Sequence, residues 1–185
     1  DELFDALDTT WARRGVDTVV HLGACSSTTE TDADYLYRNN YRYTVRLAHW
    51  CMARDDVRLV YASSAATYGD GANGYRDDER ELDSLRPMNM YGYSKHLFDR
   101  YAQRQGWFDR IVGLKYFNVF GPNEDHKAGM RSLLNKAFPR VRETGVLQLF
   151  ASGRDDYEDG EQCRDFIYVK DAVAMTGYFV TNRSV

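Results

Sequence analysis

Hydrophobic positions in the first third of the chain predict two buried strands and two amphipathic helices. Residues 18–22 (TVVHL) and 57–61 (VRLVY) are short, nearly continuous apolar runs. This pattern is typical of parallel strands that are covered on both faces. Residues 1–14 and 34–54 instead carry apolar side chains at helical spacing, so we expect a helix over each.

A third strand is predicted over 110–120 (RIVGLKYFNVF), after a helix that runs from Tyr91 to about Gln105 with Leu97 facing inward. Strands that alternate with helices predict a parallel sheet with right-handed crossovers. The sequence therefore predicts an α/β fold with a Rossmann-like parallel sheet. In such folds ligands bind beyond the carboxyl ends of the strands.

The strand–helix alternation ends after Pro122, and the rest of the chain is predicted to belong partly to a separate lobe. A helix is predicted over 132–143, a short strand over 146–150, and a strand over 164–169 that leads into a last helix. We expect three regions with bounds 1–122, 123–163 and 164–185. Residues 71–87 are charged without an apolar period and are predicted to form a surface loop.

Composition limits the class of partner. The 185 residues carry a net charge of −4, which argues against nucleic acid as the main partner. Three widely spaced cysteines without a Cys-x-x-Cys pair argue against a disulfide framework or a metal site, and fit a reducing compartment. No membrane span or signal peptide is evident, so we expect a cytoplasmic protein. The chain begins in mid-helix, and we expect a piece of a longer protein.

The strongest candidate chemistry is a tyrosine and a lysine four residues apart, Tyr91 and Lys95. This spacing places both on one helical face, and a nearby ammonium is expected to lower the pKa of the phenol toward neutral pH. With 14 tyrosines the spacing also arises by chance, so the motif alone does not establish a site. Ser64 and Asn118 follow neighbouring strands, and we expect both at the same sheet edge as Tyr91.

Other residues near the strand ends leave two interpretations open. The small residues of 23–27 let a ligand approach the backbone, or form an ordinary turn. The Ser64 hydroxyl can hydrogen-bond a substrate oxygen, or help to make a turn. Asn39 and Asn40 lie on a solvated helix face, or face inward and bond backbone groups or a ligand.

Five motifs in this order resemble the extended short-chain dehydrogenase/reductase superfamily: HLGA, SSAATYG, YGYSK, YFNVFGP and RDFIYV. Three longer stretches, HLGACSSTTETD, YFNVFGPNEDHKAGM and DGEQCRDFIYV, resemble the ADP-L-glycero-D-manno-heptose 6-epimerase family within it. The resemblance spans nearly the whole chain. It implies that 1–122 is the remainder of an NADP-binding domain and that 123–163 is part of a small C-terminal substrate-binding lobe.

The resemblance also implies a function. The family inverts C6 of ADP-D-glycero-D-manno-heptose by transient oxidation with NADP, as a homo-oligomer that supplies lipopolysaccharide core precursors. The alternatives are another NAD(P)-dependent nucleotide-sugar epimerase or dehydratase, and a non-catalytic dinucleotide-binding fragment.

Residue roles follow from the same resemblance. The implied catalytic residues are Ser64, Tyr91, Lys95 and Lys127. The implied NADP contacts are Leu22, Gly23, Ala24, Cys25, Ser26, Asn39, Lys95, Val119 and Lys127. The implied substrate contacts are Asn118, Gly129, Lys136, Phe150, Ala151, Ser152, Gly153 and Arg164.

The chain departs from the family at three places. Gly129 and Lys136 stand where the family has Ser and His, and residues 150–153 read as a rearranged form of Phe-Glu-Gly-Ser. The N-terminal Gly-rich unit is missing, and no GxxGxxG occurs in the chain. We therefore expect an incomplete cradle for the NADP diphosphate.

Overall fold

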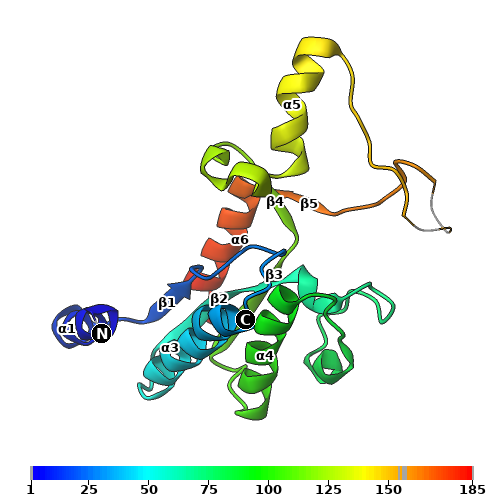
Figure 1. Ribbon diagram of the computed structural model, residues 1–185. Coiled ribbons are helices and arrows are strands. Elements are labelled where there is room, and N and C mark those ends of the chain that lie inside the picture. The colour runs from blue at the N-terminus through cyan, green and yellow to red at the C-terminus, as the bar shows by residue number, and fades with distance from the viewer. Residues whose placement is uncertain (1, 154, 156–157, 185) are drawn as a thin grey trace. The chain divides into compact units, whose positions relative to one another are not determined.

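The computed structural model describes residues 2–153, 155 and 158–184 (Figure 1). They fall into two compact units, Asp1–Lys115 with Thr176–Val185, and Tyr116–Met175. The elements in chain order are α1 (Glu2–Arg14), β1 (Thr18–His21), α2 (Ala33–Leu36), the π-helix η1 (Tyr37–Arg42), α3 (Tyr43–Met52), β2 (Arg58–Ser64), the 3₁₀-helices η2 (Ala65–Tyr68) and η3 (Glu79–Ser84), α4 (Met90–Arg104), β3 (Ile111–Tyr116), β4 (Asn118–Phe120), the 3₁₀-helix η4 (Asp125–Met130), α5 (Leu133–Thr144), β5 (Phe166–Tyr168) and α6 (Val169–Thr181).

The first unit is built on a three-stranded sheet in the order β1-β2-β3. β1 is parallel to β2, with Thr18 opposite Arg58 and His21 opposite Tyr61. Helices α3 and α4 cover the same face of this sheet (Figure 1). The predicted α/β class is confirmed, and β2 runs on to Ser64, beyond its predicted end at Tyr61.

The core of this unit lies between the two helices and the sheet. Its buried hydrophobic residues are Leu47, Ala48, Trp50, Cys51, Val57, Leu59, Tyr61, Phe98, Ala102 and Ile111. Helix α1 packs the partly buried Phe4 and Leu7 against this core and makes polar contacts as well. The Asp8 carboxylate accepts from Trp50 Nε1 at 2.7 Å and pairs with Arg54 at 2.6 Å. The prediction that Leu97 faces inward is wrong, because its side chain is 46% exposed.

The predicted third strand is divided in two. β3 ends at Tyr116, and β4 pairs with β5 in a separate parallel sheet, with Asn118 opposite Phe166. The prediction of one continuous strand over 110–120 is wrong because β5 satisfies the backbone hydrogen bonds of 118–120. Asn118 and Val119 therefore belong to the second unit.

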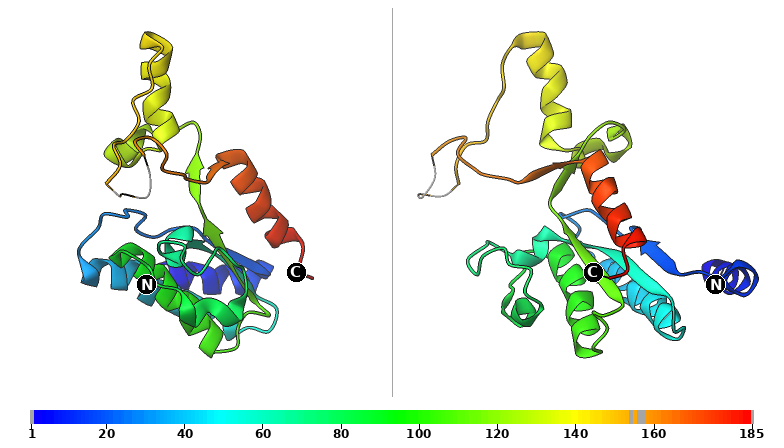
Figure 2. Two further views of the ribbon diagram at one scale, coloured as in Figure 1. Left: turned by 90° about the vertical axis from the view of Figure 1, so that its right-hand side faces the viewer. Right: turned by 180° about the vertical axis from the view of Figure 1, so that it is seen from behind.

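The second unit also lacks a predicted strand. Residues 146–150 form no strand, and the residues that the structure describes between α5 and β5 have no regular structure (Figure 2). The Gly160 N–H donates to the Phe150 carbonyl at 2.9 Å. Alternation alone does not make a strand, since its backbone groups need a neighbouring strand as partner.

The stretch 71–87 is more ordered than predicted. It contains η3, in which Leu82 is 6% exposed, and Leu85 directly after it is 5% exposed. The charged side chains around them pair with one another or with α4, as Asp83 does with Arg100 at 2.6 Å. Two leucines three residues apart are too short a signal for a periodicity argument.

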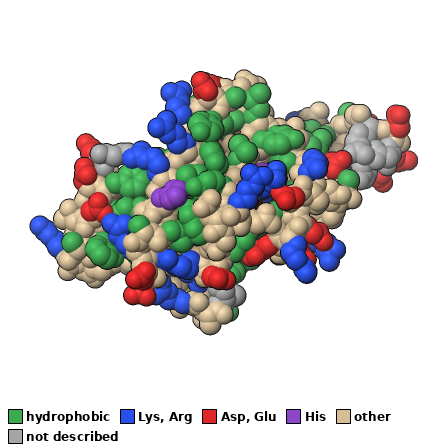
Figure 3. Space-filling model, turned by 90° about the horizontal axis from the view of Figure 1, so that it is seen from below, with side chains coloured by type: hydrophobic (Ala, Val, Ile, Leu, Met, Phe, Trp, Pro, Cys, Tyr) green, Lys and Arg blue, Asp and Glu red, His purple; other side chains and the backbone are tan. Residues whose placement is uncertain are grey.

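The surface seen in Figure 3 mixes basic, acidic and hydrophobic side chains. In the described residues, no helix has the length and apolar character needed to cross a membrane.

Candidate active site

The turn after β2 fixes the backbone around Ser64. The Ser64 Oγ accepts from the Ala66 N–H at 3.1 Å, and the Thr67 hydroxyl donates to the Ser64 carbonyl at 2.8 Å. Gly69 closes the turn at φ +72°, and a Cβ there would overlap the Arg86 carbonyl. Only glycine meets both conditions easily.

Helix α4 begins against this turn. The Asn89 side chain caps it by accepting from the Gly92 N–H at 2.7 Å. A Cβ at Gly92 would lie 2.8 Å from the Ala66 carbonyl oxygen and 3.0 Å from Pro87 Cβ. The missing side chain at Gly92 therefore allows the close approach that brings Tyr91 to Ser64.

Ser64, Tyr91 and Lys95 form one group, as predicted from their positions after β2 and at the start of α4. Tyr91 and Lys95 are 9% and 7% exposed. The Tyr91 phenol and the Ser64 hydroxyl share a hydrogen bond, and Lys95 Nζ donates to the Ala62 carbonyl at 2.8 Å. The predicted grouping is confirmed.

The protonation of this group differs from the expectation. Burial raises the pKa of Tyr91, although the hydrogen bond with Ser64 opposes the rise. The prediction that Lys95 lowers this pKa is wrong here, since the ammonium is directed to the Ala62 carbonyl. Burial lowers the pKa of Lys95 to about 8, although Asp99 and Cys25 oppose the change. At neutral pH Lys95 is therefore still mainly an ammonium, while Tyr91 stays neutral.

Asn40 is a member of the site that was not assigned from the sequence. It lies in the π-helix η1, where the Tyr43 N–H bonds to the Arg38 carbonyl, and it is 1% exposed. Its Oδ1 accepts from the Cys25 N–H at 2.8 Å, and its Nδ2 donates to the Cys25 carbonyl at 3.0 Å and to Ser94 Oγ at 2.9 Å. Asn40 therefore ties the loop after β1 to α4.

Its neighbour Asn39 is exposed and donates to the Tyr35 carbonyl at 2.8 Å. Asn40 thus faces inward and bonds backbone groups, whereas Asn39 lies on the solvated face of the helix. The sequence pattern did not predict the π-helix. Its wider turn changes the direction in which the following side chains point, compared with a regular α-helix. The NADP contact assigned to Asn39 stays a prediction.

The loop after β1 is open to a ligand at Gly23, where nothing lies within 4 Å of an added Cβ. At the end of β1, His21 Nε2 donates to the Thr44 hydroxyl at 3.1 Å, because that hydroxyl donates to the Asn40 carbonyl. Burial, together with the charge of Lys95, lowers the pKa of His21 to about 4. The imidazole is thus neutral at physiological pH.

In the second unit, Lys127 is exposed in η4, and Glu124 organises its turn. The Glu124 carboxylate accepts from the Gly121 N–H at 3.0 Å and from the Ser132 N–H at 2.6 Å and hydroxyl at 2.8 Å. Burial works to raise the pKa of Glu124, but these hydrogen bonds lower it. Ala128 has φ +46°, a strained value for a residue with a side chain.

The two departures from the family pattern contact each other, as Lys136 Nζ donates to the Gly129 carbonyl at 3.1 Å. Farther along, the Ser152 N–H donates to Asp159 at 2.6 Å, and Gln162 Nε2 donates to the Ala151 carbonyl. These contacts close the loop that holds 150–153.

The remaining predicted substrate contacts flank β5. Asn118 Nδ2 donates to the Asp165 carbonyl at 2.9 Å, and Arg164 is exposed and donates to the Cys163 carbonyl at 2.6 Å. They belong to the second unit, whereas Ser64 belongs to the first. That both sets form one site stays a prediction.

Substituting alanine for Gly92 is expected to lower the free energy of unfolding by about 1–3 kcal/mol, as overpacking does. The added Cβ forces α4 away from the Ala66 carbonyl. Denaturant unfolding measures the change. Gly177→Ala in α6 is the matched control, because nothing lies within 4 Å of its Cβ. Equal stability of the Gly92 variant and the original protein would contradict this close contact.

An α/β sheet that carries a serine, a tyrosine and a lysine at one strand end and the following helix has the arrangement of a short-chain dehydrogenase/reductase. The chain matches the model of the NAD dependent epimerase/dehydratase family over residues 4–184. It belongs to that family. A nicotinamide dinucleotide is therefore the cofactor class.

The chain is similar to curated proteins called ADP-L-glycero-D-manno-heptose-6-epimerase. It is 54% identical to the one from Nitratidesulfovibrio vulgaris over 170 residues, 92% of this chain and 52% of the relative. It is 47% identical to the one from Fusobacterium nucleatum, over 90% of this chain and 51% of the relative. The chain thus spans about half the length of these relatives.

A solved structure gives the same picture. The crystal structure of Helicobacter pylori ADP-L-glycero-D-manno-heptose-6-epimerase is similar to this chain, with a TM-score of 0.71 and 28% sequence identity. The match covers 87% of this chain and 48% of that chain. The fold and the family are therefore shown by sequence and by structure.

Proposed function

We propose that the full-length protein containing this chain is an NADP-dependent epimerase that inverts C6 of ADP-D-glycero-D-manno-heptose. The observation that carries the proposal is the buried contact between Ser64 and Tyr91 beside Lys95. It occurs in a chain that is 54% identical to a curated epimerase of that specificity. The product would be the L-glycero epimer, a lipopolysaccharide core precursor.

The first unit fits the nicotinamide end of a dinucleotide. Gly23 leaves open space beside the loop backbone, Asn40 fixes the backbone of Cys25, and the Lys95 amine is buried next to Tyr91. The Gly-rich turn that binds the diphosphate has no counterpart in this sequence. The residues we assign to NADP are Leu22, Gly23, Ala24, Cys25, Ser26, Asn39, Lys95, Val119 and Lys127.

The bound nicotinamide supplies the hydride acceptor and donor for C6. Tyr91 moves the proton of the C6 oxygen, and Ser64 orients that oxygen through the hydroxyl that also contacts the phenol. The Lys95 ammonium, here directed to the Ala62 carbonyl, is assigned to the same step and would stabilise the ionised phenol only by turning toward Tyr91. Lys127 is our second acid/base residue, since inversion requires proton transfer to the sugar in two opposite orientations.

The second unit carries the substrate contacts that we propose: Asn118, Gly129, Lys136, Phe150, Ala151, Ser152, Gly153 and Arg164. The Arg164 guanidinium suits the diphosphate of an ADP-sugar, because it bonds two oxygens at once. We assign 1–122 to NADP binding and 123–163 to the substrate lobe, followed by 164–185. The full-length protein is proposed to be a cytoplasmic homo-oligomer.

A dehydratase of the same family is the second candidate. Dehydratases place acidic residues after the serine of this turn, whereas Ala65 and Ala66 follow Ser64 here. The deciding assay gives the full-length protein ADP-D-glycero-D-manno-heptose with NADP and identifies the product by NMR. Inversion at C6 is expected. Loss of water, or activity on UDP-sugars alone, would overturn the proposed function.

The 185-residue chain by itself is expected to bind NADP weakly or not at all. It lacks the Gly-rich turn whose backbone N–H groups hold the pyrophosphate. Calorimetric titration of the chain measures this, with the full-length protein as the control. Equally tight binding by both would show that the Gly-rich turn is dispensable for the cofactor.

A further inference from the structure

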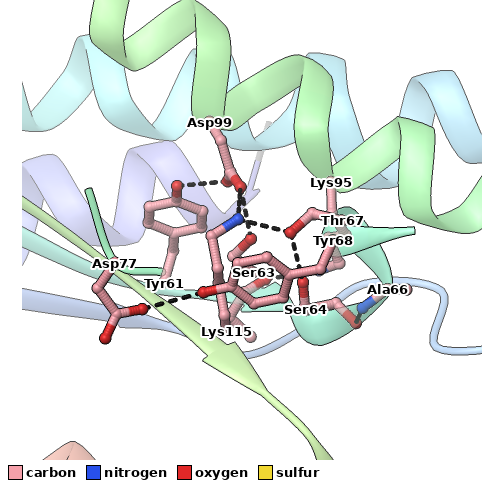
Figure 4. A network of polar contacts seen from close by, with 11 residues as sticks. Tyr61, Ser63, Ser64, Ala66, Thr67, Tyr68, Asp77, Lys95, Asp99 and Lys115 are labelled. Atoms are coloured by element: carbon pink, nitrogen blue, oxygen red, sulfur yellow. Dashed lines mark hydrogen bonds and ion pairs between the residues drawn. The ribbon is translucent and has the colours of Figure 1, made fainter. Parts of the chain in front are cut away.

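Asp99 is a buried carboxylate that the proposed mechanism does not use. It lies one helical turn after Lys95 on α4 and is 2% exposed. Three donors surround it, Tyr61 Oη at 2.6 Å, Ser63 Oγ at 2.8 Å and Lys115 Nζ at 2.9 Å (Figure 4). The carboxylate therefore connects α4 to both β2 and β3.

The same network reaches Ser64 from two directions. Ser63, bound directly to Asp99, precedes it in β2. Lys115 also donates to the Thr67 hydroxyl, which in turn donates to the Ser64 carbonyl at 2.8 Å (Figure 4). The backbone on each side of Ser64 is thus tied to one carboxylate.

A buried ion pair is a costly way to stabilise a fold, because both charges lose their hydration. The Asp99–Lys115 pair is 3% and 16% exposed at its two side chains. The sequence also keeps space for the network, since a Cβ at Gly113 would overlap the Tyr61 hydroxyl. Apolar residues of similar size often fill such a region without loss of stability, which makes the pair a candidate for a role besides packing.

We propose that Asp99 is a positioning residue of the Ser64–Tyr91–Lys95 group: it fixes Ser64 through β2 and places a buried carboxylate one helical turn from Lys95. The inference rests on the proposed function only for what Lys95 does in the reaction. The contacts themselves are independent of it.

The charges around Lys95 support the second part. The titratable groups that interact with it are His21 from β1, Cys25 from the following loop, and Asp99 from its own helix. Burial lowers the pKa of Lys95 to about 8, and the Asp99 carboxylate is the largest influence that opposes this. Without that carboxylate, more of the amine would be neutral at physiological pH.

The groups that face Asp99 are Tyr61, Tyr68, His96 and Lys115. Burial and Asp99 itself raise the pKa of Tyr61 far above its usual value, so the phenol stays a neutral donor. Burial raises the pKa of Tyr68 above its usual value and lowers that of His96. Tyr61, Tyr68 and His96 are therefore neutral, and the charged groups of this cluster are Asp99 and its partner Lys115.

The test is an NMR titration of the Lys95 side chain in the 185-residue chain labelled at lysine ¹³Cε. In Asp99→Asn the pKa of Lys95 is expected to fall below its value of about 8, because the opposing charge is gone. If Asp99 served packing alone, the variant would admit water and the pKa would rise toward the ordinary 10.5. A rise or an unchanged value would overturn the proposal.

Two further variants keep the result interpretable. Asp99→Asn with Lys115→Gln removes both charges of the ion pair, so Lys115 is not left without its carboxylate, and the same fall in the pKa of Lys95 is expected. Tyr61→Phe removes one hydrogen bond from the carboxylate but keeps its charge, so the pKa of Lys95 should remain about 8. An equal fall in Tyr61→Phe, which keeps the carboxylate, would show that the charge of Asp99 is not the cause and would overturn the proposal. The titration needs no turnover, so its failure is distinct from failure of the epimerase assay.

Discussion

Phenylalanine in place of Tyr91 is expected to lower the kcat of C6 epimerisation by about 10²–10⁴-fold in the full-length protein, the usual contribution of a positioned acid/base group. The substitution keeps the buried ring and removes only the hydroxyl that contacts Ser64. Substrate binding should change little, so the loss should appear in kcat with KM nearly unchanged. Steady-state kinetics with ADP-D-glycero-D-manno-heptose measures both constants.

Tyr93→Phe is the matched control for this substitution. Tyr93 lies two residues along the same helix, but its side chain is 48% exposed. Its hydroxyl is outside the Ser64 group, so its removal should leave kcat nearly unchanged, and as an exposed position it should change stability by only about ±0.5 kcal/mol. Equal losses in the two variants would remove Tyr91 from the mechanism.

Lys127→Ala in the full-length protein is the second large effect that we expect. If Lys127 serves one orientation of the sugar and Tyr91 the other, the variant should lose net inversion while it still oxidises one epimer. The loss in kcat should again be about 10²–10⁴-fold. Reduction of bound NADP, followed by absorbance in a single turnover, would report the surviving half-reaction.

Lys127 has an ordinary alternative role as an exposed lysine on a polar turn. Lys170→Ala is its control, because Lys170 is another exposed lysine in the second unit, at the start of α6. Full epimerisation by Lys127→Ala would show that Lys127 is an ordinary solvated lysine with no part in the reaction. Tyr91 would then be the acid/base residue that remains assigned.

The sheet of the first unit could be predicted because each strand is an apolar run between helices of regular period. The grouping of Ser64, Tyr91 and Lys95 could be predicted for the same reason, since consecutive parallel strands end at one edge. The division at Phe117 could not, because it depends on β5, which pairs with residues about fifty positions earlier in the chain. Local pattern carries no information about such a partner.

Two details of the site depend on burial that the sequence does not display. An ammonium four residues away is expected to lower the pKa of a phenol, yet burial dominates and raises the pKa of Tyr91. Asn39 and Asn40 are the same residue type in adjacent positions, and the wider turn of η1 decides which of them faces Ser94. Both outcomes follow from the folded environment rather than from residue identity.

The π-helix has a consequence for engineering. It holds more residues per turn than an α-helix, so deleting one residue within 37–39 would let the hydrogen-bond ladder return to regular α geometry. The regular helix would be the more stable one by itself, but Asn40 would rotate by about 100° away from Cys25. A design procedure that rewards ideal helices would thus select a chain in which the loop after β1 is no longer tied to α4.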